Sequence, residues 1–558
     1  MAGDASTLPL HGAAAKRRFP AGWRARGRAA ELADADSGVR VGALALATIV
    51  ALSLFVVLIA ANRPSILTPT THSGYFPRWM AGPLGGALQG FTNNGETLKW
   101  LFTGSILIMY GAYVLVFKHA RRLPRRWVIA TIVAVHAIFL LSPPLALTDL
   151  FNYVNYGRME VVHGLNPYTT IPVLEPHSDP SYLLSNWHQL LSPYGPLFTL
   201  ITFAVVPLGV GGSFWALKGL LMLASLGTLV LVWKCARLLG RDPLPAVVFA
   251  GLNPIVLVWG LGGDHNDFLM LFFIVLGFYL LLLAQARAAA ERAGAPAASA
   301  PAASPWERVR GWLVPLSALD VCTGAAFVTA TAIKASAAVL IPVVLASLLR
   351  APRRLVQVVL GIVLAGAVAA AASLLAFGLH IPDLSTQGTL VTGESVPNLI
   401  GLALGLGGES EGLRVVMELV LLALLLGCCW LAWKTDPAGP ALAGSFAPET
   451  PGERAGGGEG MHAGECNQAE RAITASAWAS VALLVTLSWV LPWYVVWVLP
   501  LAALSHSRRL RTVTLVFGVY LIIVWAPVSG LLWNALHFYP ARTPLGRLHQ
   551  RYVKELLN

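Results

Sequence analysis

Acidic, amide and phenol side chains are concentrated in residues 148–168, which read TDLFNYVNYGRMEVVHGLNPY. Helical spacing would place these polar residues on one side: Asp149, Asn152, Tyr153, Tyr156, Glu160 and His163. It would place these apolar residues on the other side: Leu150, Phe151, Val154, Val161 and Val162. The pattern predicts an amphipathic helix in the interface of a membrane, with its apolar side toward the bilayer. The alternative is an interfacial helix that carries no chemistry.

Asp149 is the residue of this stretch that is best suited to acid–base chemistry. A carboxylate at a membrane boundary is costly unless it has a role or a partner. Partial burial would raise its pKa and prepare it to accept a proton. We therefore predict that Asp149 is a general base. Asp149 is also a candidate cap for the helix that follows, and the two roles are compatible.

Two further polar sequences lie between apolar segments. GGDHND contains His265, Asn266 and Asp267, which form either a substrate contact or a hydrated turn. The carboxylates and the histidine lack the ligand spacing of zinc motifs, so no metal site is predicted, although a divalent metal stays possible. Lys334, in TAIKAS, either snorkels to the interface or binds an anion such as a lipid phosphate. Arg158 is a similar candidate.

Aromatic residues mark two other segments. The prolines of SPYGP, at 192–196, fix a rigid turn that brings Tyr194 to the interface. A second group surrounds Pro492 and consists of Trp489, Trp493, Tyr494 and Trp497. This group indicates either an ordinary aromatic belt at the membrane surface or a surface that stacks on sugar rings.

The composition of the chain identifies the elements that must position these residues. Of 558 residues, 56% are hydrophobic and 12% are charged, against about 25% charged residues in soluble proteins. The mean hydropathy is +0.67. These values exclude an ordinary soluble enzyme, a disordered protein and a disulfide scaffold. The five cysteines form no CxxC pair and predict neither disulfides nor a zinc site.

Long apolar runs predict an all-α polytopic membrane protein with about 13 transmembrane helices. We expect these helices near residues 41–61, 99–117, 127–147, 214–233, 243–261, 268–286, 311–330, 335–349, 356–378, 414–433, 472–490, 493–505 and 513–533. The net charge of +12 fits the positive-inside bias of such a protein better than nucleic-acid binding.

Basic residues predict the topology. With the N-terminus inside, the basic stretches 118–126, 234–241, 287–310, 350–354, 434–471 and 508–511 all fall on the cytoplasmic side. This agreement requires that residues 196–210 do not fully cross the membrane, and it places the C-terminal tail outside.

The expected organisation has three parts. Residues 1–40 form a disordered basic cytoplasmic tail, residues 41–533 form the transmembrane bundle, and residues 534–558 form a C-terminal tail. Flexible cytoplasmic linkers are expected at 288–305 and 436–469. The outer loop at 148–194 carries the site. Polar groups concentrated at one face are more typical of an enzyme that works there than of a transporter with a midplane site.

Four stretches together resemble the membrane glycosyltransferases of the GT-C superfamily. They are TDLFNYVNYGRMEVVHGLNPY with the following SPYGPLF, GGDHNDFLML, TAIKASAAVLIP and LPWYVVWVLPLAAL. The sequence most closely resembles the actinobacterial polyprenol-phosphate-mannose-dependent α-1,6-mannosyltransferases that build lipomannan cores. The resemblance implies a GT-C-like bundle in the plasma membrane with its active site on the outer face. It also implies a polyprenyl-phosphate sugar donor, a glycolipid or polysaccharide acceptor, and inversion to an α linkage.

The resemblance also suggests roles for residues. Asp149 would take the proton of the acceptor hydroxyl. Stabilisation of the leaving phosphate would fall to Arg158, His265 or Lys334. The sugar pocket would be shaped by Asn166, Tyr168 and Tyr194. The remaining predicted substrate contacts are Asn152, Tyr153, Tyr156, Glu160, Asn266 and Asp267.

The sequence departs from the family pattern at one position of the site. Leu150 follows Asp149 where the family carries a tandem acidic pair, so a metal requirement does not carry over. Three alternatives stay open: a GT-C enzyme that transfers another lipid-linked sugar such as arabinose or glucose or that modifies protein, a lipid-linked-sugar flippase or transporter, and a scaffold of the cell envelope.

Overall fold

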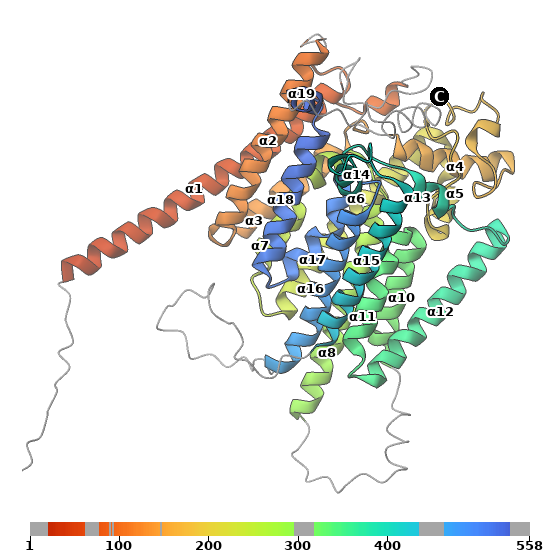
Figure 1. Cartoon of the computed structure of the whole chain (residues 1–558). Helices are drawn as coiled ribbons and strands as arrows, with labels where there is room; N and C mark the ends of the chain where they lie inside the picture. The colour runs from red at the N-terminus through yellow and green to blue at the C-terminus, as the bar shows by residue number, and fades with distance from the viewer. Residues whose placement is uncertain are drawn as a thin grey trace, which may run out of the picture.

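The computed structural model describes residues 21–61, 77–88, 91, 94–145, 148–294, 317–434 and 463–535. Within these residues the regular secondary structure is helical throughout and contains no strand (Figure 1). The predicted all-α class is therefore confirmed. Apart from its first two residues, which end α19, the predicted C-terminal tail lies outside the described residues, as do residues 1–20. The predicted linkers lie mostly outside them too, with α8 reaching Gly294 and α16 starting at Ala463.

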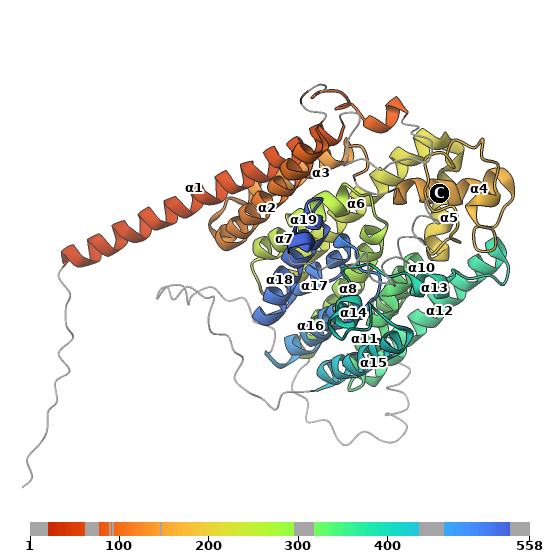
Figure 2. The ribbon, with the colours of Figure 1, turned by 45° about the horizontal axis from the view of Figure 1, so that its top comes forward.

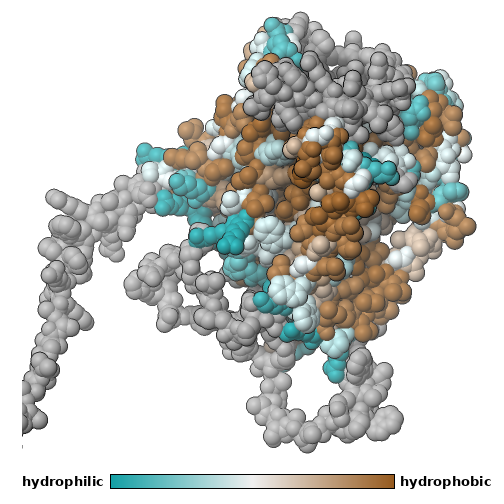
Figure 3. Space-filling view, viewed as in Figure 1, coloured by the Kyte–Doolittle hydropathy of each residue, from teal (hydrophilic) through white to brown (hydrophobic). Residues whose placement is uncertain are grey.

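Six helical segments are long and apolar enough to cross a membrane, which confirms a polytopic membrane protein. They are Ser37–Ala60, Gly95–Arg122, Pro196–Leu238, Asp267–Glu291, Pro352–Phe377 and Glu411–Trp433. Shorter apolar helical stretches are Ala318–Ile333, Ala335–Leu348 and Pro492–Leu504. The number of about 13 spans stays a prediction. Hydrophobic residues cover much of the visible face of the bundle (Figure 3), as expected of a surface that meets lipid.

The principal helices follow one another as α1 (Ala21–Ala60), α2 (Gly95–His119), α3 (Arg125–Leu140), α4 (Asp149–His163), α5 (Pro196–Val205), α6 (Gly209–Leu238), α7 (Pro243–Gly251), α8 (Asp267–Gly294), α10 (Ala318–Ile333), α11 (Leu340–Leu348), α12 (Pro352–Phe377), α13 (Leu384–Thr389), α14 (Val396–Ala403), α15 (Glu411–Trp433), α16 (Ala463–Thr486), α17 (Leu499–Leu504), α18 (Arg508–Trp525) and α19 (Ser529–Ala535). Helices α1, α2 and α3 pack together on one side of the bundle, whereas α4 and α5 lie on the opposite side (Figures 1 and 2).

Helix α4 forms where the amphipathic helix was predicted. It ends at Gly164, which adopts φ 66° and donates its N–H to the carbonyl of Glu160. Glycine adopts this left-handed conformation without a steric penalty, so the expected stop signal is confirmed.

The predicted orientation of the apolar side of α4 is wrong for most of its length. Leu150, Phe151 and Val154 are each at most 1% exposed, and Phe151 stacks on Phe214 of α6. These side chains face the protein because α5 and α6 pack against the helix. At the last turn, Val161 and Val162 are 48% exposed.

Helix α5 is too short to cross a membrane by itself. Its ten residues span about 15 Å, half of a hydrocarbon core of about 30 Å. The 3-10 turn Val206–Leu208 separates it from α6, whose first residue, Gly209, adopts φ 71°. The prediction that residues 196–210 do not fully cross stays open, and this break is compatible with it.

Candidate functional site

Asp149 is the first residue of α4 and is buried, with 6% of its surface exposed. The hydroxyl of Tyr194 donates to its Oδ1 at 3.3 Å. The Nδ1 of His265 lies 3.9 Å from its Oδ2. The structure thus brings together three residues that the sequence analysis selected, from α4, from the loop before α5 and from the turn before α8.

Burial raises the pKa of Asp149 to about 7. The charge of Lys334 and the hydrogen bond from Tyr194 lower that pKa, and the charge of Asp267 raises it further. Burial lowers the pKa of His265 well below its ordinary value, and the charge of Lys334 adds to this effect. A carboxyl group with a pKa near 7 beside a neutral imidazole is suited to accept a proton near neutral pH.

The turn that carries His265 is held on several sides. The ring of His265 stacks on Trp493, with centroids 3.7 Å apart and an interplanar angle of 7°. The backbone N–H of Asn266 donates to the hydroxyl oxygen of Tyr153 at 3.2 Å. The amide group of Asn266 is buried and makes no hydrogen bond within the described structure. Such a group is available to bind a ligand, because buried polar groups are otherwise hydrogen-bonded.

Lys334 is the cation of this site. It follows α10 and lies 2.8 Å from both carboxylate oxygens of Asp267, the first residue of α8. Its Nζ is 5.0 Å from the ring centre of Tyr494 and 5.4 Å from that of Trp497. The indole N–H of Trp497 also donates to Asp267. Two aromatic rings and one carboxylate therefore hold the ammonium group in place.

Arg158 belongs to a different cluster. It makes a bidentate ion pair with Asp179, with its closest contact at 2.8 Å, and His163 binds the same carboxylate. Burial raises the pKa of Asp179, but hydrogen bonds from Arg158, Ser181 and His163 outweigh burial and lower it. Arg158 lies about 14 Å from Asp149 along the axis of α4, because it follows Asp149 by nine positions.

Glu160 is also distant from Asp149, by about 16 Å along α4. Burial raises its pKa. The structure therefore does not bring Arg158 or Glu160 to the carboxyl group of Asp149, although the helical pattern places Glu160 on the same side.

Four other residues that were predicted to contact the substrate form hydrogen bonds that hold the loop at residues 164–195 in place. Asn152 accepts the N–H of Asn186 at 3.2 Å, and the hydroxyl of Tyr156 donates to the carbonyl of Leu190 at 2.7 Å. Asn166 donates to the carbonyl of Phe377 at 3.0 Å, and Tyr168 donates to the carbonyl of Tyr194 at 2.7 Å. Tyr168 thus positions the tyrosine that binds Asp149.

The roles of Trp493 and Trp497 as partners of His265 and Asp267 were not predicted from the sequence, because spacing alone does not show which residue each ring contacts. Lys218 of α6 was not predicted either; it is fully buried and lies 3.0 Å from Asp264. A charge inside an apolar run was the signal that would have found Lys218. The described residues contain no group of three or more His, Cys, Asp or Glu side chains arranged to hold a metal ion.

Comparison with known proteins relates this site to a family. The profile of the family described as "Alpha-(1->6)-mannopyranosyltransferase, N-terminal domain" matches residues 41–350, which is more than half of the chain. The chain belongs to this family. The match includes Asp149, Tyr194, His265 and Lys334, so most of the site of this mannopyranosyltransferase-family protein lies inside the shared region. Trp493 and Trp497 lie outside it.

Curated relatives carry related names. Alpha-(1->6)-mannopyranosyltransferase A of Mycobacterium tuberculosis is 37% identical over 145 residues, which cover 25% of this chain and 28% of that protein. A probable alpha-(1->6)-mannopyranosyltransferase of Mycolicibacterium smegmatis is 27% identical over 186 residues, covering 31% and 33%. Alpha-(1->6)-mannopyranosyltransferase A of Corynebacterium glutamicum is 24% identical over 155 residues, covering 27% and 31%.

The matched segments span a third or less of the length of these relatives. No solved structure matches the chain.

Proposed function

We propose that this chain is an inverting glycosyltransferase that moves mannose from a polyprenyl-phosphate donor to a mannan or glycolipid acceptor. The linkage formed would be α-1,6, and the reaction would take place on the outer face of the plasma membrane. The observation that carries the proposal is the buried carboxyl group of Asp149, with a pKa raised to about 7, in one site with the cation Lys334. Membership of the mannopyranosyltransferase family supports the sugar.

In the proposed reaction Asp149 is the base. Its carboxylate takes the proton of the acceptor hydroxyl while the hydroxyl oxygen forms a bond to C1 of the donor sugar. The bond between C1 and the phosphate oxygen breaks on the opposite face, and its electron pair leaves with polyprenyl phosphate. Attack opposite the leaving group inverts the configuration at C1, so a β-linked donor gives an α-linked product.

Lys334 is the residue best placed to stabilise the leaving phosphate. A positioned cation stabilises charge that develops in the transition state. Of the three candidates from the sequence, Arg158 is bound to Asp179 away from the site, and the lowered pKa of His265 keeps its imidazole neutral near pH 7. Lys334 is part of the site through its ion pair with Asp267 and directly follows the apolar helix Ala318–Ile333.

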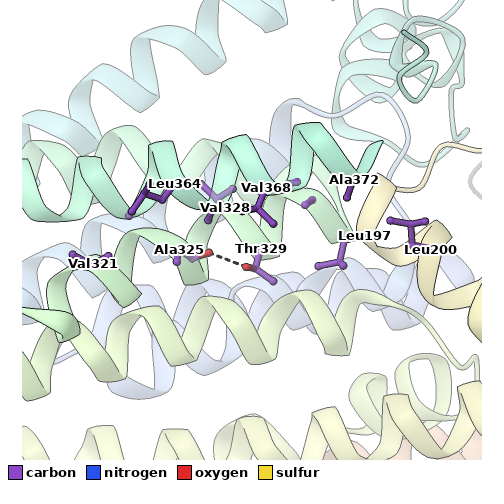
Figure 4. A pocket seen from close by; sticks show the side chains of 13 residues that line it. Leu197, Leu200, Val321, Ala325, Val328, Thr329, Leu364, Val368 and Ala372 are labelled. Atoms are coloured by element: carbon purple, nitrogen blue, oxygen red, sulfur yellow. Dashed lines mark hydrogen bonds between the residues drawn. The ribbon is translucent and has the colours of Figure 1, made fainter. Parts of the chain in front are cut away.

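An apolar groove along α10, the helix that Lys334 follows, supports a lipid-linked donor. The groove lies between α5, α10 and α12 and has a cavity volume of about 340 Å³ (Figure 4). Its walls are formed by Leu197, Leu200, Val321, Ala325, Val328, Thr329, Ala332, Gly361, Leu364, Ala365, Val368, Ala369 and Ala372. The hydroxyl of Thr329 donates to the carbonyl of Ala325, so its hydrogen is used within α10.

The groove opens because α10 and α12 meet closely at one point and then diverge. Gly324 of α10 and Gly361 of α12 each face the backbone of the other helix, where an added Cβ would overlap with it. From this contact the helices separate toward the end that carries α5 (Figures 1 and 4). Leu364 and Val368 are 53% and 70% exposed, so the groove is open to the outer surface of the bundle.

One end of the groove lies near Lys334 along the chain. Ala332 lines the groove and stands two residues before Lys334. The backbone N–H of Gly195 donates to the carbonyl of Ile333 at 3.1 Å, which fixes the start of α5 against this end of α10. We infer that a prenyl chain in the groove would direct its phosphate toward Lys334.

A transfer assay tests the proposed function. Membranes that contain the full chain would be given radiolabelled polyprenyl-phosphate mannose and a short α-1,6 mannoside, with arabinose and glucose donors in parallel. Extension of the mannoside by mannose through an α-1,6 bond is the expected result. If only another sugar were transferred, that sugar and not mannose would be the donor sugar. If the lipid-linked sugar crossed the vesicle membrane without being transferred, the protein would be a flippase and not a transferase.

A further inference from the structure

A buried lysine joins the two chain segments that carry the site. Lys218 lies in the apolar helix α6 and is fully buried. Its ammonium group donates to the backbone carbonyl of Ser142 at 2.7 Å and to Oδ2 of Asp264 at 3.0 Å. Ser142 follows α3 on the segment that leads to Asp149, and Asp264 directly precedes His265. One cation therefore contacts both segments.

The two segments also bind each other. The backbone N–H of Leu145 donates to the carbonyl of Gly262 at 2.7 Å. This bond and the contacts of Lys218 connect the same two stretches of chain at different points. Two segments that are connected at separate points have little freedom to rotate relative to each other. The hydrogen bond and the contacts of Lys218 together therefore fix the relative position of the segments more firmly than one contact would.

The turn at Asp264 needs such support. Asp264 adopts φ 57°, a left-handed conformation that is uncommon for residues other than glycine. A strained conformation of this kind persists when the surrounding structure enforces it. The ion pair with Lys218 holds the side chain of Asp264 on the side of α6. The backbone then carries the ring of His265 to within 3.9 Å of Asp149.

We propose that Lys218 is a positioning residue for the transfer reaction, and that its contacts with Ser142 and Asp264 set the approach of His265 to Asp149. The inference rests on the proposed function, because it takes Asp149 as the base. The competing explanation is that Lys218 only neutralises the buried carboxylate of Asp264. A charged side chain in an apolar helix is costly unless it has a partner or a role, and each explanation supplies one.

Two variants distinguish these explanations. Lys218→Met removes the ammonium group and leaves Asp264 as an unpaired buried acid. Lys218→Met combined with Asp264→Asn removes both charges, and asparagine tolerates the left-handed conformation at this position. Lys234→Met, in the same helix but outside these contacts, is the matched control.

Steady-state transfer kinetics are the first measurement. We expect kcat to fall by about 10- to 100-fold in both Lys218 variants, because small displacements of catalytic groups have effects of this size. The KM for the donor should stay within about twofold, since Lys334 is unchanged. Recovery of wild-type kcat in the double variant would show charge neutralisation alone and would overturn the proposal.

Hydrogen exchange gives a measurement that does not depend on activity. Loss of Lys218 should speed amide exchange in peptides covering residues 142–145 and 262–266 together, in the single and the double variant, without a change in α16. Unchanged exchange in either segment would overturn the proposal. If the wild-type chain transfers no sugar, this measurement still tests the contacts of Lys218, so failure of the inference and failure of the proposed function remain distinguishable.

Discussion

The ammonium group of Lys334 contacts both carboxylate oxygens of Asp267 at 2.8 Å, and this ion pair acts on the carboxyl group of Asp149. The two charges have opposite effects, because the lysine lowers the pKa of Asp149 and the aspartate raises it. Burial is the largest influence and leaves that pKa at about 7. The proposed base therefore changes its protonation state near neutral pH.

The first prediction concerns the pH dependence of transfer. A base must be deprotonated to act, and Asp149 loses its proton as the pH rises through about 7. We expect kcat/KM to increase from pH 6 to pH 8 with a midpoint near 7, as kcat/KM reports groups of the free enzyme. Initial rates at low donor concentration measure this. A profile that is flat over the range would contradict the assignment.

The second prediction concerns Lys334. Lys334→Gln removes the cation next to the proposed phosphate position and should lower kcat/KM by about 100-fold. It should also move the midpoint of the pH profile upward, because the charge that lowers the pKa of Asp149 is lost. Lys434→Gln, beyond the end of α15, is the control. An unchanged midpoint would show that the charge of Lys334 does not act on Asp149.

The third prediction tests the groove between α5, α10 and α12. Ala369→Trp should fill it and raise the KM for a long-chain polyprenyl donor by about tenfold or more, since one buried side chain is worth about 1.5–3 kcal/mol. A donor with a chain of two isoprene units should be affected little. Ala369 lines the groove, whereas the neighbouring Ala370 is exposed and does not.

Ala370→Trp is the matched control for this experiment. It adds the same indole to the same helix and should leave both donors unaffected. If Ala369→Trp raised the KM for the short and the long donor equally, the prenyl chain would not bind in this groove.

The fourth prediction concerns the stability of the loop after α4. Burial raises the pKa of Glu175 to about 8, from 4.5 in the unfolded chain. The folded protein therefore keeps a proton that the unfolded chain releases above pH 4.5, and stability is lost as the pH rises toward 8. Glu175→Gln should remove this part of the pH dependence. Thermal unfolding in detergent between pH 5 and pH 8 measures it, and identical slopes for both proteins would refute the prediction.

The sequence predicted the class of fold because its main signal, long apolar runs, is local. It also predicted where α4 begins and ends, because Asp149 and Gly164 stand at its boundaries. It did not predict how α4 is buried. Whether Leu150 and Phe151 face lipid or protein depends on α5 and α6, and the periodicity of one helix contains no information about its neighbours.

The site was predictable in its residue types but not in its partners. Asp149, His265 and Lys334 were selected because polar groups next to apolar spans are unusual, and the structure places them near one another. Arg158 met the same criterion but binds Asp179 instead. Pairings between residues far apart in the chain, such as His265 with Trp493, follow from tertiary packing and leave no local pattern.

Single-turnover sugar transfer by Asp149→Asn, with saturating donor and acceptor, tests whether Asp149 is the base. Asparagine keeps the size and the hydrogen bond from Tyr194 but does not accept a proton at neutral pH. We expect donor binding as in the wild type and a rate lower by about 100-fold or more, the range expected for loss of a general base. A transfer rate within a few-fold of the wild type would contradict the assignment of Asp149 as the base.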